Sequence, residues 1–230
     1  GYGNYGQIGD GNIYSGGTSQ GARRVTFEQN LSAVSISAGY SSTCAILQDG
    51  SVWCWGYNDQ GQLGIGNYTN QDIPYKVGLP IGRTAIALSS GYYHACAILD
   101  DNSINCWGKN DEGQIGAGTG PDKPSPVGVI GITSVPIQIS AGATSTCAVF
   151  ENGGIKCWGD NTYGQLGIGS TTDSPSPQTL NSISHLSASQ VSVGNNYACA
   201  LFHDGAPRCW GLNSVSQLGI GTTGNRISPT

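Results

Sequence analysis

The sequence contains no methionine and few charged residues. Asp, Glu, Lys and Arg make up 10% of the 230 residues, where about 25% is ordinary. No run of about 18 apolar residues is present, so we expect no membrane-spanning helix and no insertion into a membrane. The 14 acidic residues outnumber the 9 Lys and Arg, giving a net charge of -5. This excess of acid argues against nucleic acid as a partner. Because an initiating methionine is missing, we expect the chain to begin within a longer gene product.

Glycine is the residue in excess. Its 37 copies are about twice the usual share, yet they follow no Gly-X-Y period, which excludes collagen. Hydrophobic residues make up 37% of the chain, which is enough to form a buried core, so the composition is not that of a disordered segment. A length of 230 residues allows one or two domains, and all-β folds commonly use this many residues for one.

A repeat of about 52 residues organises the sequence. Cysteine pairs recur at steps of 52, 51 and 52 residues, and the residues from the first Cys-Ala to the following Cys-Trp-Gly recur with them. The motif Gly-Gln-Leu-Gly-Ile-Gly or a close variant follows each pair, at 61–66, 113–118, 164–169 and 216–221, and a fifth copy stands at 6–11. The chain therefore holds four repeat periods with partial ends. We divide it into a partial repeat with a long connection, three repeats and a second partial repeat: 1–39, 40–91, 92–142, 143–194 and 195–230.

Each repeat is predicted to form β-strands. Apolar and polar residues alternate in short runs such as 34–36 and 191–193, as in half-buried strands. The segments that begin at Cys-Ala and end at Cys-Trp-Gly predict two further strands joined by a tight turn. Four short strands in about 50 residues are typical of a propeller blade. The predicted fold is therefore all-β, a β-propeller built from blades of about 52 residues.

The repeat also resembles a known family. The text Trp-Gly-x-Asn followed by Gly-Gln-Leu-Gly-x-Gly is similar to the repeat of the regulator of chromosome condensation family, and it recurs four times in register. The resemblance covers nearly the whole chain and implies a β-propeller, usually one of seven blades. Four repeat periods are too few for such a ring. We therefore expect part of a larger propeller, an unusual small ring or an open repeat array.

The ten-residue spacing of the cysteines predicts disulfides. If Cys44 and Cys54 oppose each other on antiparallel strands, the hairpin loop is 48–50 and its last residue favours a left-handed backbone. That position holds Gly in three repeats and Asn102 in the other, the two residue types that adopt this conformation most easily. The predicted pairs are Cys44–Cys54, Cys96–Cys106, Cys147–Cys157 and Cys199–Cys209.

Two alternatives for the cysteines stay open at this stage, free thiols and metal binding. Zinc-binding pairs are normally spaced by about two to four residues, which does not fit this spacing. Disulfides persist in oxidising compartments, so the pairing predicts a secreted or cell-surface protein. The intracellular members of the family lack such regular pairing, and the resemblance is therefore to a secreted, disulfide-bearing variant.

Catalytic residues are hard to find in the sequence. His94, His185 and His203 occupy different positions of the repeat, and no nucleophile or metal-binding motif is present. The repeated Asp49 and Asp101 belong to the predicted hairpin turns. We therefore predict that the protein is not an enzyme and needs no cofactor or metal.

The positions that differ between repeats are the better indication of a site. They lie in the loops that follow the first strand of each repeat, which are expected to gather on one face and are rich in Tyr, Asn and Ser. The candidate partner-binding residues are Tyr40, Tyr92, Tyr93, His94, Asn195, Asn196 and Tyr197. The alternative is that exposed tyrosines only line the rim. A second variable ring follows each Trp-Gly and is the weaker candidate: Tyr57, Lys109, Asp160 and Leu212.

Two sequons, at Asn30 and Asn67, are candidate glycosylation sites. Together these features predict an extracellular, non-catalytic binding or structural module. Its partner would be a protein, a surface glycan or other copies of the chain, in recognition, adhesion or self-assembly. The resemblance implies one alternative, a nucleotide exchange factor for the small GTPase Ran or a chromatin-binding propeller. A secreted enzyme inhibitor is the other.

Overall fold

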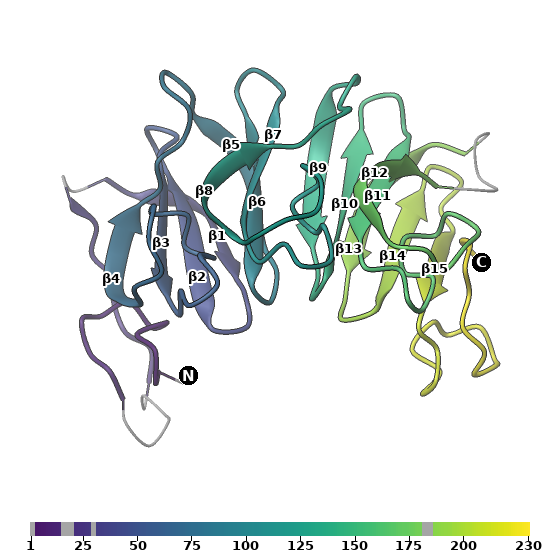
Figure 1. Ribbon diagram of the computed structural model, residues 1–230, viewed down its shortest axis with the longest axis horizontal. Helices are drawn as coiled ribbons and strands as arrows, with labels where there is room; N and C mark the ends of the chain where they lie inside the picture. Colours follow the sequence, from purple (N-terminus) through teal and green to yellow (C-terminus); the bar gives the residue numbers. More distant parts are fainter. Residues whose placement is uncertain (1–2, 15–20, 29–30, 181–185) are drawn as a thin grey trace.

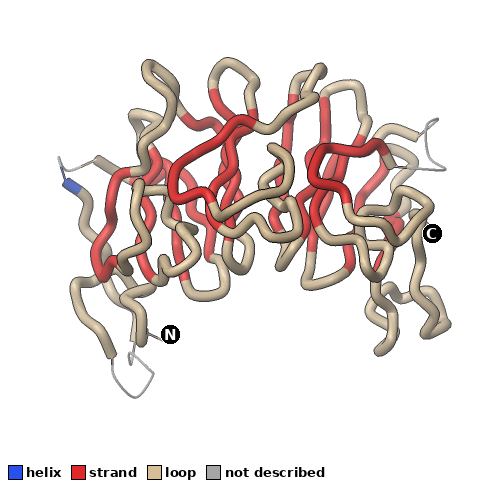
Figure 2. The backbone as a smooth tube through the Cα atoms, in the orientation of Figure 1, coloured by secondary structure: helices blue, strands red, loops and turns tan. Residues whose placement is uncertain are grey.

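The computed structural model describes residues 3–14, 21–28, 31–180 and 186–230. These residues form β-strands without an α-helix, in three four-stranded antiparallel sheets and one three-stranded sheet. The sheets follow one another along an open arc, with the two chain termini at its opposite ends (Figures 1 and 2). This is the all-β blade arrangement predicted from the repeat.

Each sheet is a meander of consecutive strands. The first contains β1 (Ala33–Ala38), β2 (Ser42–Leu47), β3 (Val52–Gly56) and β4 (Gln71–Lys76). The second contains β5 (Ala85–Ser90), β6 (His94–Leu99), β7 (Ile104–Gly108) and β8 (Lys123–Gly128). The third contains β9 (Pro136–Ala141), β10 (Ser145–Phe150), β11 (Ile155–Gly159) and β12 (Ser174–Thr179). The fourth contains β13 (Ala188–Val193), β14 (Tyr197–Phe202) and β15 (Pro207–Gly211).

The predicted repeat boundaries and the sheets differ in phase. Each boundary at 40, 92, 143 and 195 falls just after the first strand of a sheet, so a repeat drawn that way begins in one blade and ends in the next. In the fourth blade the C-terminal residues take the place of the outer strand. The backbone of Thr230 exchanges two hydrogen bonds with Cys209, at 3.1 and 3.2 Å, and Arg226 bridges to Gly211.

The four predicted disulfides are those that the structure contains. In each hairpin the two cysteines are direct cross-strand partners, as Cys147 and Cys157 are between β10 and β11. Their Cα atoms lie 4.0–4.1 Å apart, and all eight cysteines are paired. The loop residue predicted to be left-handed has φ of +75° at Gly50 and +65° at Asn102. The turn therefore sets the register that brings the sulfurs together.

A tryptophan joins each blade to the one before it. The Nε1 group of Trp107 donates to the carbonyl oxygen of Gln62 at 3.0 Å, and Trp210 donates to that of Gln165 at 2.8 Å. Trp158 and Trp55 make the equivalent bonds, and all four rings are almost completely buried. The acceptor for Trp55 is Gln7, so segment 3–14 does for the first blade what a preceding blade does for the others.

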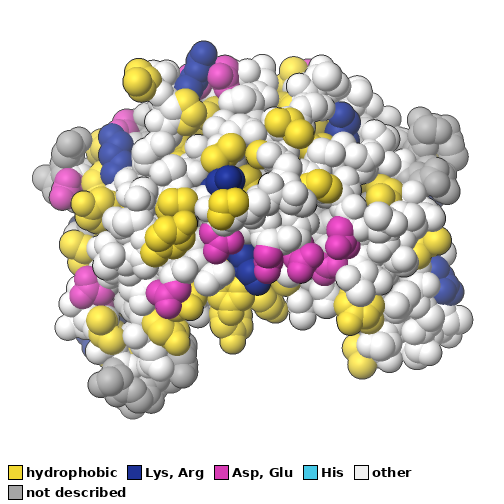
Figure 3. Space-filling model, in the orientation of Figure 1, with side chains coloured by type: hydrophobic (Ala, Val, Ile, Leu, Met, Phe, Trp, Pro, Cys, Tyr) yellow, Lys and Arg dark blue, Asp and Glu magenta, His cyan; other side chains and the backbone are white. Residues whose placement is uncertain are grey.

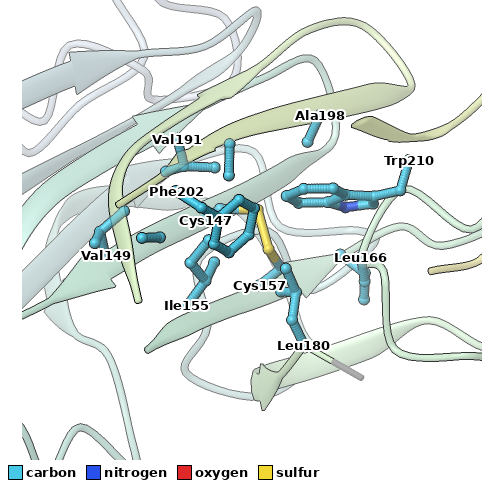
Figure 4. Packing of buried hydrophobic residues seen from close by; sticks show 12 residues of the cluster. Cys147, Val149, Ile155, Cys157, Leu166, Leu180, Val191, Ala198, Phe202 and Trp210 are labelled. Atoms are coloured by element: carbon cyan, nitrogen blue, oxygen red, sulfur yellow. A yellow bond between two sulfur atoms is a disulfide. The ribbon is translucent and has the colours of Figure 1, made fainter. Parts of the chain in front are cut away.

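The hydrophobic core lies between neighbouring blades. One cluster combines side chains from β10 and β11 with side chains from the next sheet, including Val191 and Phe202. Figure 4 shows the Trp210 ring directed toward the Cys147–Cys157 disulfide in this cluster. Each of the first three disulfides therefore staples its hairpin and also supplies apolar surface to the next blade.

Among the described residues, each of the two outermost sheets has one face without a neighbouring sheet. Leu201 is 40% exposed, whereas Val149, at the same repeat position in the third blade, is completely buried. At the other end of the arc Ile36 is 69% exposed, and its equivalent Ile139 is 6% exposed. Burial at a given repeat position is therefore decided by the presence of a neighbouring blade.

Candidate functional site

The loops after the first strands converge on one face of the arc. Gly39, Gly91, Gly142 and Gly194 follow β1, β5, β9 and β13. The backbones approach so closely there that a Cβ atom on Gly91 would collide with the carbonyl oxygen of Gly142. The amide of Tyr92 donates to that same oxygen at 3.1 Å. The predicted gathering of these loops is thus present, and glycine is required because only hydrogen fits.

A hollow of about 290 Å³ opens between these loops. Its lining comes from the four glycines and the ends of the first strands, together with the side chains of Tyr40, Tyr92 and Asn195. Three residues predicted as partner-binding therefore border one concavity. They come from three different blades, which places them around the centre of the arc.

Tyrosines continue from this hollow across the surface. The rings of Tyr40 and Tyr92 lie 5.1 Å apart, and Tyr93 lies 6.0 Å from Tyr40. Tyr57 follows at 6.2 Å from Tyr93, and Tyr5 at 4.8 Å from Tyr57. Tyr5, Tyr40 and Tyr92 are exposed by 37–63%. We call these five side chains the tyrosine row.

The second variable ring joins the first through backbone hydrogen bonds. The amide of Tyr57 donates to the carbonyl oxygen of Ser41 at 2.8 Å, and the amide of Lys109 donates to that of Tyr93 at 2.8 Å. Each residue after a Trp-Gly is thereby fixed beside the loop of its own blade. The sequence indicated Tyr57 only as the weaker candidate and did not indicate Tyr5. The motif at 6–11, which shows that 3–14 replaces a blade loop, was the available signal for Tyr5.

Buried asparagines hold these residues in place. Asn58 directly follows Tyr57; its Nδ2 donates to the carbonyl oxygen of Asn67 at 2.9 Å, and its Oδ1 accepts from the amide of Leu63 at 2.9 Å. Asn110 makes the same type of contacts after Lys109. Each asparagine side chain hydrogen-bonds to backbone groups on both sides of its loop. The exposed residue that precedes the asparagine therefore has little conformational freedom.

Lys109 connects the tyrosine row to a group of carboxylates. Its Nζ atom lies 5.9 Å from the centroid of the Tyr93 ring and 2.9 Å from Oδ2 of Asp111. The hydrogen bond to Asp111 raises the pKa of Lys109. Burial and the nearby carboxylates Asp111, Asp160 and Asp173 raise the pKa of Glu112. Figure 3 shows Asp and Glu side chains in a row on this side of the molecule, next to hydrophobic side chains.

His94 does not belong to the surface, contrary to the prediction. It is 1% exposed, and its Nε2 atom lies 2.8 Å from Oγ1 of Thr146 in the next blade. The first residue of β6 faces the third blade, so the side chain is taken into the interface between blades. Burial lowers the pKa of His94 to about 4, which keeps the ring neutral.

The remaining predicted residues are placed less centrally. Asn195 is exposed at the hollow, whereas Asn196 and Tyr197 are half-buried, and the carbonyl oxygen of Asn196 accepts from the amide of Leu212. Asn67 is exposed, so its amide is accessible to a glycosylating enzyme. Asn30 lies outside the described residues. Partner binding and glycosylation at these positions stay predictions.

His203 is exposed in a hairpin turn, and His185 lies outside the described residues. Within the described ranges, no group of three His, Cys, Asp or Glu side chains is arranged to hold a metal ion. Nor does that part of the chain include a helix long and apolar enough to cross a membrane.

Comparison of the sequence with known protein families identifies the same repeat. The family model described as the regulator of chromosome condensation (RCC1) repeat matches residues 49–98, 101–149 and 152–201. A second model with the same description matches 33–62, 85–114 and 137–165. The chain belongs to the RCC1 repeat family.

Curated relatives of this RCC1 repeat chain are longer proteins of different kinds. The ultraviolet-B receptor UVR8 of Arabidopsis thaliana is 29% identical over the whole chain, which spans 52% of the receptor. The human E3 ubiquitin-protein ligase HERC2 is 29% identical over 77% of the chain, and the match covers 4% of the ligase. The chain thus spans about half the length of the receptor and a small part of the ligase.

Solved structures agree on the fold. Human WBSCR16 superimposes with a TM-score of 0.84 at 24% identity, over 99% of this RCC1 repeat chain and 60% of that protein. Yeast RCC1 (Prp20), solved bound to Kap60, superimposes with a TM-score of 0.80 at 22% identity, over 90% of this chain and 50% of that one. At these identities the likeness establishes the propeller fold.

Proposed function

We propose that this RCC1 repeat chain is an extracellular, non-catalytic module that binds a protein through the tyrosine row and the hollow beside it. The tyrosine row is the observation that carries the proposal. Five tyrosines from three blade positions form one continuous surface, and a contiguous exposed aromatic surface is typical of an interaction site. Tyr side chains bind partners well because they bring a large area with little conformational entropy to lose.

Rigid display supports this function. The glycine contacts, the asparagine anchors and the disulfides fix the loops before a partner arrives, which lowers the entropic cost of association. The structure of yeast RCC1 was solved with Kap60, and a second structure of Prp20p is described with its binding to Gsp1p and histones. Those partners belong to that protein, but they support protein binding as a use of this fold.

The extracellular location is supported by the cysteines. Four disulfides in one chain are stable in an oxidising compartment and rare in a reducing one. The same pairing and the net charge of -5 speak against an intracellular exchange factor or chromatin-binding protein. Intact mass of the native protein, alkylated before and after reduction, tests the location. Alkylation of all cysteines without reductant would contradict it.

A photo-crosslinking residue at position 92 tests the binding surface. The matched control carries the same group in place of Tyr75, which is 50% exposed on the outer strand β4. With extracellular material from the source, we expect protein adducts at position 92 and few at position 75. Excess unlabelled wild-type chain should suppress them, and excess Tyr40→Ala chain should not. Equal adducts at both positions, or equal suppression by both competitors, would contradict the proposal.

A further inference from the structure

Five carboxylates gather beside the tyrosine row around Lys109. Glu112 is within electrostatic range of Asp111, Asp160 and Asp173, and Lys109 is within range of Asp122 as well as Asp111 and Glu112. We call these five acids the carboxylate group. Lys109 is hydrogen-bonded to Asp111, and Lys123 directly follows Asp122. The five acids still outnumber these two cations, so the group keeps a negative excess.

Glu112 shows that hydrogen bonds among the described residues relieve this excess only in part. It is half-buried, and burial together with the neighbouring Asp111, Asp160 and Asp173 raises its pKa. Lys109 is already hydrogen-bonded to Asp111. A cation supplied from outside would lower the repulsion among these acids, whereas an anion would increase it.

Lys109 also shows how a cation fits between the tyrosine row and the carboxylate group. Its Nζ atom lies 2.9 Å from the Asp111 carboxylate and 5.9 Å from the Tyr93 ring centroid. Charge pairing and cation–π attraction therefore act on the same ammonium group. The rings of Tyr40 and Tyr92 lie beside Tyr93, with Tyr40 at 6.0 Å from it. Among the described residues no cation lies over either ring, so both are open to a cation from a partner.

We propose that the partner segment bound by the tyrosine row is basic, with an arginine stacked on a tyrosine ring and directed at the carboxylate group. Arginine suits both contacts, because its planar guanidinium stacks on aromatic rings and bonds carboxylates through two parallel N–H groups. This inference rests on the proposed function and adds the chemical class of the partner. A neutral glycan would also stack on tyrosines and donate hydrogen bonds to carboxylates, but it carries no charge to offset the negative excess.

Peptide binding tests the inference directly. The probes are a fluorescein-labelled peptide of alternating arginine and glycine and its citrulline counterpart, which has the same shape without the charge. Fluorescence anisotropy with the oxidised 230-residue chain should show the arginine peptide binding about tenfold more tightly. Raising the salt concentration should narrow that difference.

Matched variants test the contributions of the tyrosine row and the carboxylate group to binding separately. Tyr40→Ala and Tyr93→Ala should each weaken arginine-peptide binding about tenfold, and Glu112→Gln about threefold. The controls are Tyr75→Ala and Glu151→Gln, a tyrosine on the outer strand β4 and an exposed acid in the β10–β11 turn. They should leave binding unchanged. Tyr40→Ala removes a side chain that is 63% exposed, so it keeps the test valid if Tyr93→Ala fails to fold.

The outcomes distinguish this inference from the proposed function. Equal binding of the arginine and citrulline peptides, lost in Tyr40→Ala but not in Glu112→Gln, would overturn the basic partner and leave tyrosine-mediated binding in place. Failure of both peptides to bind would also overturn the basic partner, while the crosslinks from position 92 would still decide the proposed function. If Glu112→Gln and Glu151→Gln weaken binding equally, the effect depends only on the net charge of the chain, and the inference is overturned.

Discussion

The Nε2 atom of His94 lies 2.8 Å from the Oγ1 atom of Thr146, across the boundary between the second and third blades. The Thr146 hydroxyl donates its single proton to the carbonyl oxygen of Gln114 at 3.0 Å. It must therefore accept from His94, which assigns the ring proton to Nε2. The Nδ1 atom is left buried, with no hydrogen-bond partner among the described residues. Protonation of His94 would place a charge in this interface.

Acidification is therefore expected to destabilise the fold through His94. Its pKa is about 4 in the folded protein against an ordinary 6.5, so the unfolded chain takes up a proton that the folded chain refuses. The stabilisation is complete above about pH 6.5, falls as the pH drops toward 4, and changes no further below that. The loss should approach about 3 kcal/mol, measured as the free energy of unfolding in urea at several pH values.

The control for this prediction is His94→Ser, since serine occupies the same repeat position at Ser42 and Ser145. The difference in unfolding free energy between wild type and His94→Ser should change across this pH range. Carboxylate titration is common to both proteins and cancels. A difference that is constant from pH 7 to pH 4 would contradict the assignment.

Reduction is expected to open one disulfide before the others. Cys199 and Cys209 are partly exposed on the uncovered face of the fourth sheet, whereas the cysteines of the other three pairs are completely buried. A thiol reagent has to reach the sulfur that it attacks. Mild reduction followed by alkylation and peptide mass spectrometry should label Cys199 and Cys209 first. Simultaneous labelling of all eight would mean that reduction requires global unfolding.

The tryptophans that join the blades are predicted to differ in their contribution to stability. Gln114 also accepts a hydrogen bond from Thr146, so its carbonyl oxygen keeps a partner when Trp158→Phe removes the indole donor. At the position of Thr146 the second blade has Ala95, which leaves the Gln62 oxygen without that second donor in Trp107→Phe.

The expected result is that Trp107→Phe costs more unfolding free energy than Trp158→Phe, by about 1–2 kcal/mol. Both rings are completely buried, so the two substitutions leave similar cavities and the comparison isolates the orphaned carbonyl. Thermal or urea unfolding of the two variants measures this difference in unfolding free energy. Equal losses would show that packing alone accounts for these tryptophans.

Equivalent core positions are expected to respond differently to truncation. Val149→Ala removes a completely buried side chain and should cost about 1–3 kcal/mol. Leu201→Ala, at the same repeat position in the fourth blade, should change the unfolding free energy of this chain by less than about 0.5 kcal/mol, because Leu201 is 40% exposed. A large loss on Leu201→Ala would indicate that this face is covered in solution.

The hairpins and their disulfides could be predicted because the chemistry that fixes them is local. Each cysteine pair spans ten residues, and one turn residue with a left-handed backbone, such as Gly50 or Asn102, sets the register of the two strands. The blade fold followed from the same repetition, since each repeat carries the residues that pack it against the next.

The composition of the site was decided by tertiary structure. Tyr5, Tyr57 and Tyr93 come from segments far apart in the chain, and their rings meet only because neighbouring blades pack closely. His94 varies among the repeats as a surface residue does, yet it is buried, because its position faces a neighbouring blade that accommodates side chains of different sizes. The sequence determined which local units form. The packing of one blade on another decided which side chains are buried and which meet at the surface, because burial depends on neighbours that no local pattern specifies.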